Sequence, residues 1–123
     1  MPPTIQPLVV TRDLERLLGF YSGLFGAVET TRYPPDGATF FVMLRIGDSG
    51  LGLIADSDAA VGTAQRMLLS AEVTDVDASL AQVEGLGGRV LGPPNDMPWG
   101  ERVAHVEDPD GNTINLTQKI ASA

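Results

Sequence analysis

Three side chains near the C-terminal end of the sequence have the types and spacing for acid–base or metal chemistry. Glu101, His105 and Glu107 lie on a segment that alternates polar and apolar residues, so a β-strand would place them on one face. Three ligands from one strand rarely enclose a metal ion, and the chain has no cysteine to complete a site. The pattern is more typical of a solvated acidic strand that carries the only histidine of the chain.

Other catalytic patterns are weaker. No serine lies near His105 in the sequence, which disfavours a nucleophile–base pair. The glycines of 85–88 follow a predicted helix, whereas a phosphate-binding loop precedes one. Asp75 and Asp77 stand at a helix start, where capping and the helix dipole explain them.

Trp99, the only tryptophan, is the clearest candidate for ligand contact. Pro98 restricts the preceding residue to an extended conformation, and Gly100 allows a sharp bend of the chain. An indole between these two residues is held on a loop and is either part of the core or a flat surface for stacking.

The elements around Trp99 can be predicted from turn residues. Asp108-Pro109-Asp110-Gly111 has the composition of a type I turn, and the segments 101–107 and 113–117 alternate like strands. The sequence therefore predicts a β-hairpin over 101–117.

The first half of the chain predicts a β-α-β-β-β order. Asp13 offers an N-cap, the following leucines have helical spacing, and Gly23 and Gly26 end the helix. The predicted strands are 5–10, 27–32, 39–46 and 51–55.

The second half repeats this order with an offset of 62 residues. Asp13 aligns with Asp75, Leu18 with Leu80, and Gly26 with Gly88. A strand over 66–73, a helix after Asp75 and a strand from 89 to 91 are predicted. We expect a single domain over 1–123, with module 1 at about 4–56, a linker at 57–64 and module 2 at about 65–119.

Composition limits the partners. The chain has 123 residues and 43% hydrophobic content, enough for one core without disulfides. Its net charge of -8 disfavours nucleic acid and anionic membranes and favours a neutral or cationic partner. Residues 1–6 lack the features of a signal peptide, and no stretch is long enough to cross a membrane, so we expect a cytoplasmic protein.

Four segments carry a resemblance to a known family: residues 10–15, 20–26, 98–100 and 108–112. They resemble the vicinal oxygen chelate superfamily, which includes glyoxalases, extradiol dioxygenases, fosfomycin-modifying enzymes and bleomycin-binding resistance proteins. The resemblance implies an α+β fold in which two tandem βαβββ modules form a curved mixed sheet with a cleft. It also implies a homodimer with clefts at or near the subunit interface.

Enzymes of this superfamily bind a divalent metal with four His and Glu residues. In this sequence the matching positions are Gln6, Gly52, Leu68 and Asn115. None of these is a histidine or a carboxylate, so we expect no metal and no other cofactor.

The resemblance is closest to the members that bind drugs without modifying them. We expect a protein that sequesters an aromatic natural-product antibiotic and has no catalytic residues. The expected ligand-binding residues, with Phe40 chosen over its neighbour Phe41, are Trp99, Phe40, Tyr33, His105, Asn115, Gln6 and Leu68.

Two alternatives stay open at this point. One is a metal-dependent lyase, isomerase or dioxygenase of the same superfamily with unusual ligands. The other is a metal-free enzyme assisted by His105 and Glu107. The residues at the four metal positions disfavour the first alternative, and nothing in the sequence separates the second from a binding protein.

Overall fold

The computed structural model describes residues 6–59 and 67–121 of the chain. The chain separates into two units, Met1–Ala60 and Val61–Ala123, and each has its own sheet and its own helix. Most of the predicted linker 57–64 and the first residue of the predicted strand 66–73 lie outside the described residues. Within those residues, no helix has the length and apolar character needed to span a bilayer.

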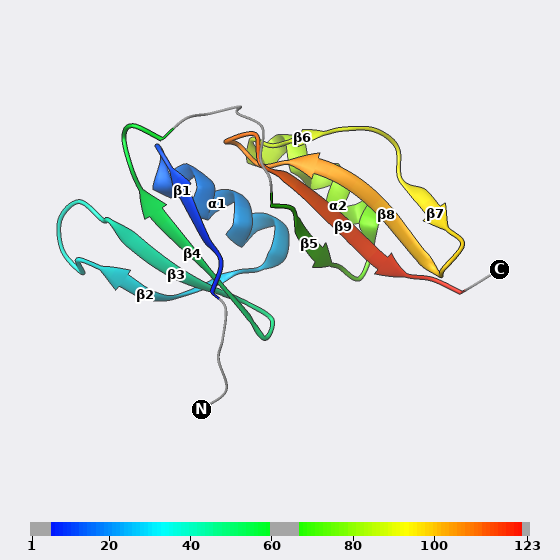
Figure 1. Ribbon diagram of the computed structural model, residues 1–123, viewed down its shortest axis with the longest axis horizontal. Helices are drawn as coiled ribbons and strands as arrows, with labels where there is room; N and C mark the ends of the chain where they lie inside the picture. Colours follow the sequence, from blue (N-terminus) through cyan, green and yellow to red (C-terminus); the bar gives the residue numbers. More distant parts are fainter. Residues whose placement is uncertain (1–5, 60–66, 122–123) are drawn as a thin grey trace. The chain divides into compact units, whose positions relative to one another are not determined.

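Unit 1 has the predicted β-α-β-β-β order (Figure 1). Strand β1 is parallel to β4, and the other neighbours are antiparallel, in the order β1-β4-β3-β2. The elements are β1 Leu8–Thr11, α1 Leu14–Phe25, β2 Val28–Tyr33, β3 Phe41–Ile46 and β4 Ser49–Ala55.

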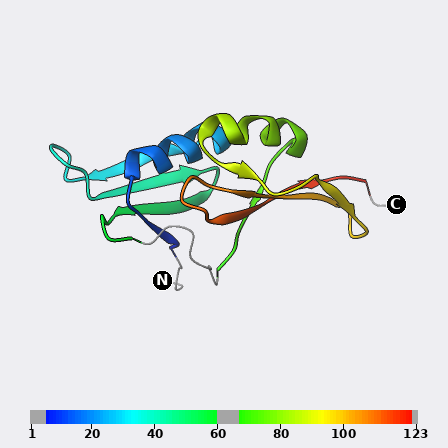
Figure 2. The ribbon, with the colours of Figure 1, turned by 90° about the horizontal axis from the view of Figure 1, so that it is seen from above.

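Helix α1 begins and ends where the sequence predicts. The side chain of Asp13 accepts a hydrogen bond from the backbone N–H of Arg16, and Gly26 ends the helix in the left-handed region at φ +67°. Gly23, predicted to help end the helix, lies inside it. The helix lies over one face of its sheet (Figure 2). The core between helix and sheet contains the buried residues Leu14, Leu17, Phe20, Tyr21, Leu24, Val42, Leu44, Leu51 and Leu53.

Unit 2 has a sheet of five strands in the order β5-β9-β8-β6, with β7 also paired to β8. Strand β5 is parallel to β9, as β1 is to β4. The elements are β5 Leu69–Glu72, α2 Val76–Val83, the 3-10 helix η1 Glu84–Leu86, β6 Arg89–Val90, β7 Asn95–Met97, β8 Glu101–Glu107 and β9 Thr113–Lys119.

The two units share one topology, which supports the predicted duplication. Asp75 caps α2 by accepting from the N–H of Ala78, as Asp13 caps α1. In unit 2 the place of β2 is divided between β6 and β7, which pair with opposite ends of β8. The predicted α+β fold of two tandem modules is confirmed. The cleft between the modules stays a prediction.

The predicted hairpin of β8 and β9 forms around Asp108. The N–H of Gly111 donates to the Asp108 carbonyl at 2.9 Å, which closes the turn. The Asp108 carboxylate accepts from the N–H groups of Asp110 and Asn112, each at 2.9 Å. The turn therefore fixes the register in which His105 lies opposite Asn115.

Candidate ligand-binding site

Each sheet has one face that its own helix does not cover. On β3, Val42 and Leu44 are fully buried against the helix side, so Phe41 and Met43 point the other way. We call this helix-free side the open face of the unit. In unit 1 the pairing register places on it Leu8, Val10, Phe41, Met43, Gly52 and Ile54.

The two open faces differ in polarity. That of unit 1 is apolar, and Leu8 and Val10 are 51% and 48% exposed. The open face of unit 2 is mostly polar, because Ala104, Val106, Ile114 and Leu116 are buried on the other side. Alternation and register place on it Leu68, Ser70, Glu72, His105, Glu107, Asn115 and Thr117.

All four positions that match the metal ligands of the superfamily lie on these open faces. The Leu8 side chain occupies the space that a Cβ on Gly52 would need, and Phe41 Cε1 lies 3.2 Å from it. Gln6 lies over Gly50, with its Oε1 2.7 Å from the position of a Cβ there. Leu68 is 54% exposed and has no donor atom in its side chain. These side chains do not fit a divalent metal.

Asn115 and His105 contact each other directly. Their Oδ1 and Nδ1 atoms are 2.6 Å apart, and the two residues are cross-strand partners. Glu107, which shares the strand face of His105, instead forms an ion pair with Arg89 at 2.9 Å. Among residues 6–59 and 67–121, no group of three or more His, Cys, Asp or Glu residues could hold a metal ion. The side chains of this face therefore provide a histidine oriented by an amide.

Trp99 lies at the tip of the β7–β8 hairpin. The N–H of Gly100 donates to the Met97 carbonyl at 3.0 Å, and Gly100 adopts φ +93°, which only glycine adopts readily. The indole is 65% exposed, and its Nε1–H donates to Glu101 Oε1 at 2.8 Å. The ring is thus outside the core and held in one orientation.

An ion-pair network supports this hairpin. Arg102 lies opposite Asp96 on β7 and bonds to it at 2.8 Å, and it bonds to Asp77 on α2 at 3.1 Å. The hydrogen bonds to Asp96 and then Asp77 raise the pKa of the Arg102 guanidinium. Through these two bonds, Arg102 connects β7, the strand that precedes Trp99, to the start of helix α2.

Tyr33 and Phe40 are neighbours at the end of the β2–β3 hairpin. The backbone N–H of Phe40 donates to the Tyr33 carbonyl at 2.9 Å. Phe40 is 54% exposed and Tyr33 is 64% exposed. Phe41 has the strand parity of the open face, because the core residue Val42 fixes the alternation of β3. Phe40 precedes β3, and its choice as the ligand contact stays a prediction.

The predicted binding residues fall into two groups, one in each unit. Gln6, Tyr33 and Phe40 belong to unit 1, and Leu68, Trp99, His105 and Asn115 belong to unit 2. Sequence reasoning missed a row across the open face of unit 1 that the register aligns, namely Val10, Ile54, Phe41 and Tyr33. It also missed the role of Glu101 as the acceptor for Trp99. Strand alternation alone could have indicated the row once the core face was known.

Comparison with known families and structures identifies the family of the chain. The sequence profile of the Glyoxalase/Bleomycin resistance protein/Dioxygenase superfamily matches residues 4–116. The chain belongs to this superfamily. The resemblance stated from the four sequence segments is therefore confirmed.

Several proteins are similar to this superfamily member over nearly its whole length. Uncharacterized protein Mb0911c of Mycobacterium bovis is 30% identical over 128 residues, covering 96% of this chain and 84% of that protein. TioX from Micromonospora sp. ML1 has a TM-score of 0.77 at 20% identity and covers 97% of this chain and 100% of its own. The fosfomycin resistance protein FosX from Mesorhizobium loti has a TM-score of 0.74 at 19% identity, and the match covers 96% of this chain and 92% of FosX. The similarity to the two solved structures shows a common fold.

Proposed function

We propose that this superfamily member binds an aromatic natural-product antibiotic without a metal and sequesters it unchanged. The observation that carries the proposal is the set of side chains at the four metal positions. An amide, a glycine, a leucine and a second amide stand where the superfamily's enzymes need imidazole and carboxylate ligands. These four positions therefore lack the ligands on which metal-assisted chemistry in the superfamily depends.

Stacking would supply the binding energy. The exposed indole of Trp99 offers a flat surface, and an aromatic pair contributes on the order of 1 kcal/mol beyond the burial of its area. In unit 1, Phe40, Tyr33 and the apolar row offer further aromatic and aliphatic surface. Gln6 adds a polar group in unit 1. In unit 2, Asn115 and His105 add polar groups and Leu68 adds apolar area. Each unit thus offers apolar surface with a few polar groups, which is typical of a small-molecule site.

The name of one similar structure is in line with a role in antibiotic resistance. FosX is named a fosfomycin resistance protein, so the same fold carries resistance to an antibiotic in another member. Because that identity is only 19%, the specific drug does not transfer to this chain.

The test uses the single tryptophan as a reporter. Purified protein is titrated with flat aromatic antibiotics, namely bleomycins, enediynes with a fused anthraquinone, phenazines and mitomycins, and indole fluorescence is followed. At least one drug should quench the emission, and extraction should return that drug chemically unchanged.

Two outcomes would contradict the proposal in different ways. Absence of quenching and of calorimetric binding across the panel would remove the sequestering function. Recovery of a modified drug would instead favour the metal-free enzyme, since the His105 ring is held by Asn115 at 2.6 Å in a position to transfer a proton. His105→Gln would then abolish turnover.

A further inference from the structure

We propose that Trp99 and Glu101 form a recognition pair for a flat aromatic cation. The proposal rests on the function proposed above, in which this hairpin contacts the ligand, and it specifies the charge class of that ligand. The observation behind it is the hydrogen bond of 2.8 Å from the indole Nε1–H to the Glu101 carboxylate.

The backbone fixes the two side chains relative to each other. Trp99 and Glu101 flank Gly100, whose N–H bonds to Met97 and whose carbonyl accepts from Ile120 N–H at 2.9 Å. Glu101 is the first residue of β8 and pairs with β7 on one side and β9 on the other. The carboxylate therefore stands on a paired strand and bonds to the N–H edge of a ring that is 65% exposed.

This arrangement favours positive charge over the ring. An aromatic face attracts cations, and tryptophan does so most strongly. A carboxylate that accepts from the indole N–H forms a charge-assisted bond, and it increases the electron density of the ring through polarisation. The same carboxylate places a negative charge at the ring edge. A ligand whose positive charge is spread over a flat ring would gain from the stacking and from both electrostatic effects.

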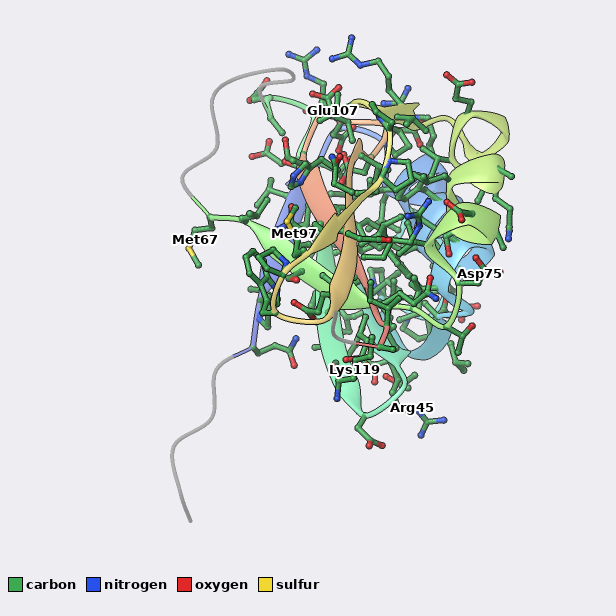
Figure 3. The ribbon with its side chains drawn as sticks, turned by 90° about the vertical axis from the view of Figure 1, so that its right-hand side faces the viewer. Arg45, Met67, Asp75, Met97, Glu107 and Lys119 are labelled. Carbon is green, nitrogen blue, oxygen red and sulfur yellow. The ribbon has the colours of Figure 1, made fainter. Side chains whose placement is uncertain are left out.

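The strand register places one basic side chain opposite Glu101. The cross-strand neighbours of Glu101 are Met97 on β7 and Lys119 on β9, both labelled in Figure 3. Asp96 is engaged with Arg102 at 2.8 Å. Within the described part of the chain, no ion pair joins Lys119 to Glu101. Lys119 is therefore the cation that would oppose a cationic ligand, while the chain as a whole carries -8.

The experiment compares three probes with one ring system: N-methylacridinium as a permanent cation, acridine as the neutral probe at pH 8, and acridine-9-carboxylate as the anion. Binding to the native chain is measured by calorimetry and by quenching of Trp99. We expect the cation to bind at least tenfold more tightly than acridine and the anion to bind most weakly. The preference for the cation should fall as salt is raised.

The decisive variant is Glu101→Gln, because a glutamine carbonyl can still accept from the indole N–H while the charge is removed. The variant should bind the cation about as tightly as it binds the neutral probe. Its affinity for acridine should stay within about twofold of that of the native chain. Glu84→Gln changes the net charge equally at an exposed position on η1 and should keep the preference. Lys119→Gln should increase the preference for the cation.

Several results would overturn the recognition pair. The first is equal binding of the cation and the neutral probe by the native chain. The second is an equal loss of the preference for the cation in Glu84→Gln and Glu101→Gln. The third is a loss of acridine binding itself in a folded Glu101→Gln. If Glu101→Gln does not fold, the salt dependence of the native chain decides between charge and contact. A drug that binds without charge preference would refute only this inference. A chain that binds neither drugs nor probes would refute the proposed function as well.

Discussion

At the scale of single residues, Trp99 is the side chain on which the proposed binding depends most. Trp99→Ala should weaken the binding of a quenching drug by tenfold or more, since roughly 1.4 kcal/mol corresponds to a factor of ten. The thermal unfolding temperature should change little, because the ring is 65% exposed and lies outside the core. Calorimetry and thermal denaturation measure the two effects separately.

A matched substitution distinguishes the role of the ring from that of the hairpin. Trp99→Phe keeps a flat surface without an N–H donor and should retain part of the affinity. Destabilisation by Trp99→Ala with unchanged drug binding would show that the indole is a structural residue, contrary to the proposal.

The residues at the four metal positions lead to a second expectation at this scale. Purified chain should carry no stoichiometric Zn, Fe, Mn or Ni, and treatment with a chelator should leave its unfolding temperature unchanged. The reason is the Gln, Gly, Leu and Asn side chains of Gln6, Gly52, Leu68 and Asn115. Elemental analysis that finds about one metal per chain, together with destabilisation by the chelator, would contradict both this expectation and the proposed function.

At the scale of elements, Gly19 inside helix α1 and Gly26 at its C-cap have opposite expected responses to alanine. Gly19 is exposed in the helix interior, and a Cβ there would meet nothing within 4 Å, so Gly19→Ala should stabilise the fold by about 0.5–1 kcal/mol. Gly26 ends the helix at φ +67°, where a Cβ costs roughly 1 kcal/mol, so Gly26→Ala should destabilise it. Urea unfolding measures both, and effects of the same sign would contradict the assigned cap.

A second element-scale expectation concerns the link between α1 and β2. Arg32 bonds to Glu29 at 2.7 Å and to Glu15 on α1 at 2.9 Å. The hydrogen bond from Arg32 lowers the pKa of Glu29 from its usual value. A lowered folded-state pKa contributes stability that is present above the unfolded value and is lost as pH falls through the folded value.

Glu29→Gln tests this link. The unfolding temperature of the variant should be slightly below that of the native chain at pH 7, because exposed pairs contribute little. The difference should disappear only as the pH falls through the lowered pKa of Glu29, where the native carboxylate becomes protonated. A difference that persists in acid would assign the effect to packing and not to charge.

How far the sequence predicts the elements depends on whether their determinants are local. The N-caps of α1 and α2 and the Asp108 turn each depend on a few adjacent residues, and all three form as predicted. Strand β7 was missed because Asn and Asp have low strand propensity, and it forms through pairing with β8. The choice between Phe40 and Phe41 required knowing which face meets α1, which alternation alone does not give. The Trp99–Glu101 bond was missed because a side-chain contact across a glycine has no periodic pattern in sequence.

At the scale of the whole molecule, the charge of -8 affects which ligands approach. A strongly acidic protein attracts cations from a distance and repels phosphates, and salt screens both effects. This long-range attraction acts on any cation. Only the local pair at Trp99 would distinguish a flat aromatic cation from a simple one, which is why a variant with the same net charge is the necessary control.

The open face of unit 1 leads to the last expectation, that the chain forms a homodimer. Leu8, Val10 and Tyr33 are each about half or more exposed there, and exposed apolar faces are typical of partner sites. Sedimentation should give twice the mass of the 13.0 kDa chain at micromolar concentration. Val10→Glu should shift the equilibrium toward the monomer, because a carboxylate would lose its hydration in the interface. Ala81→Glu, on the exposed side of α2, adds the same charge and should leave the dimer intact. A native chain that sediments as a monomer with and without bound drug would show that a single copy accounts for binding.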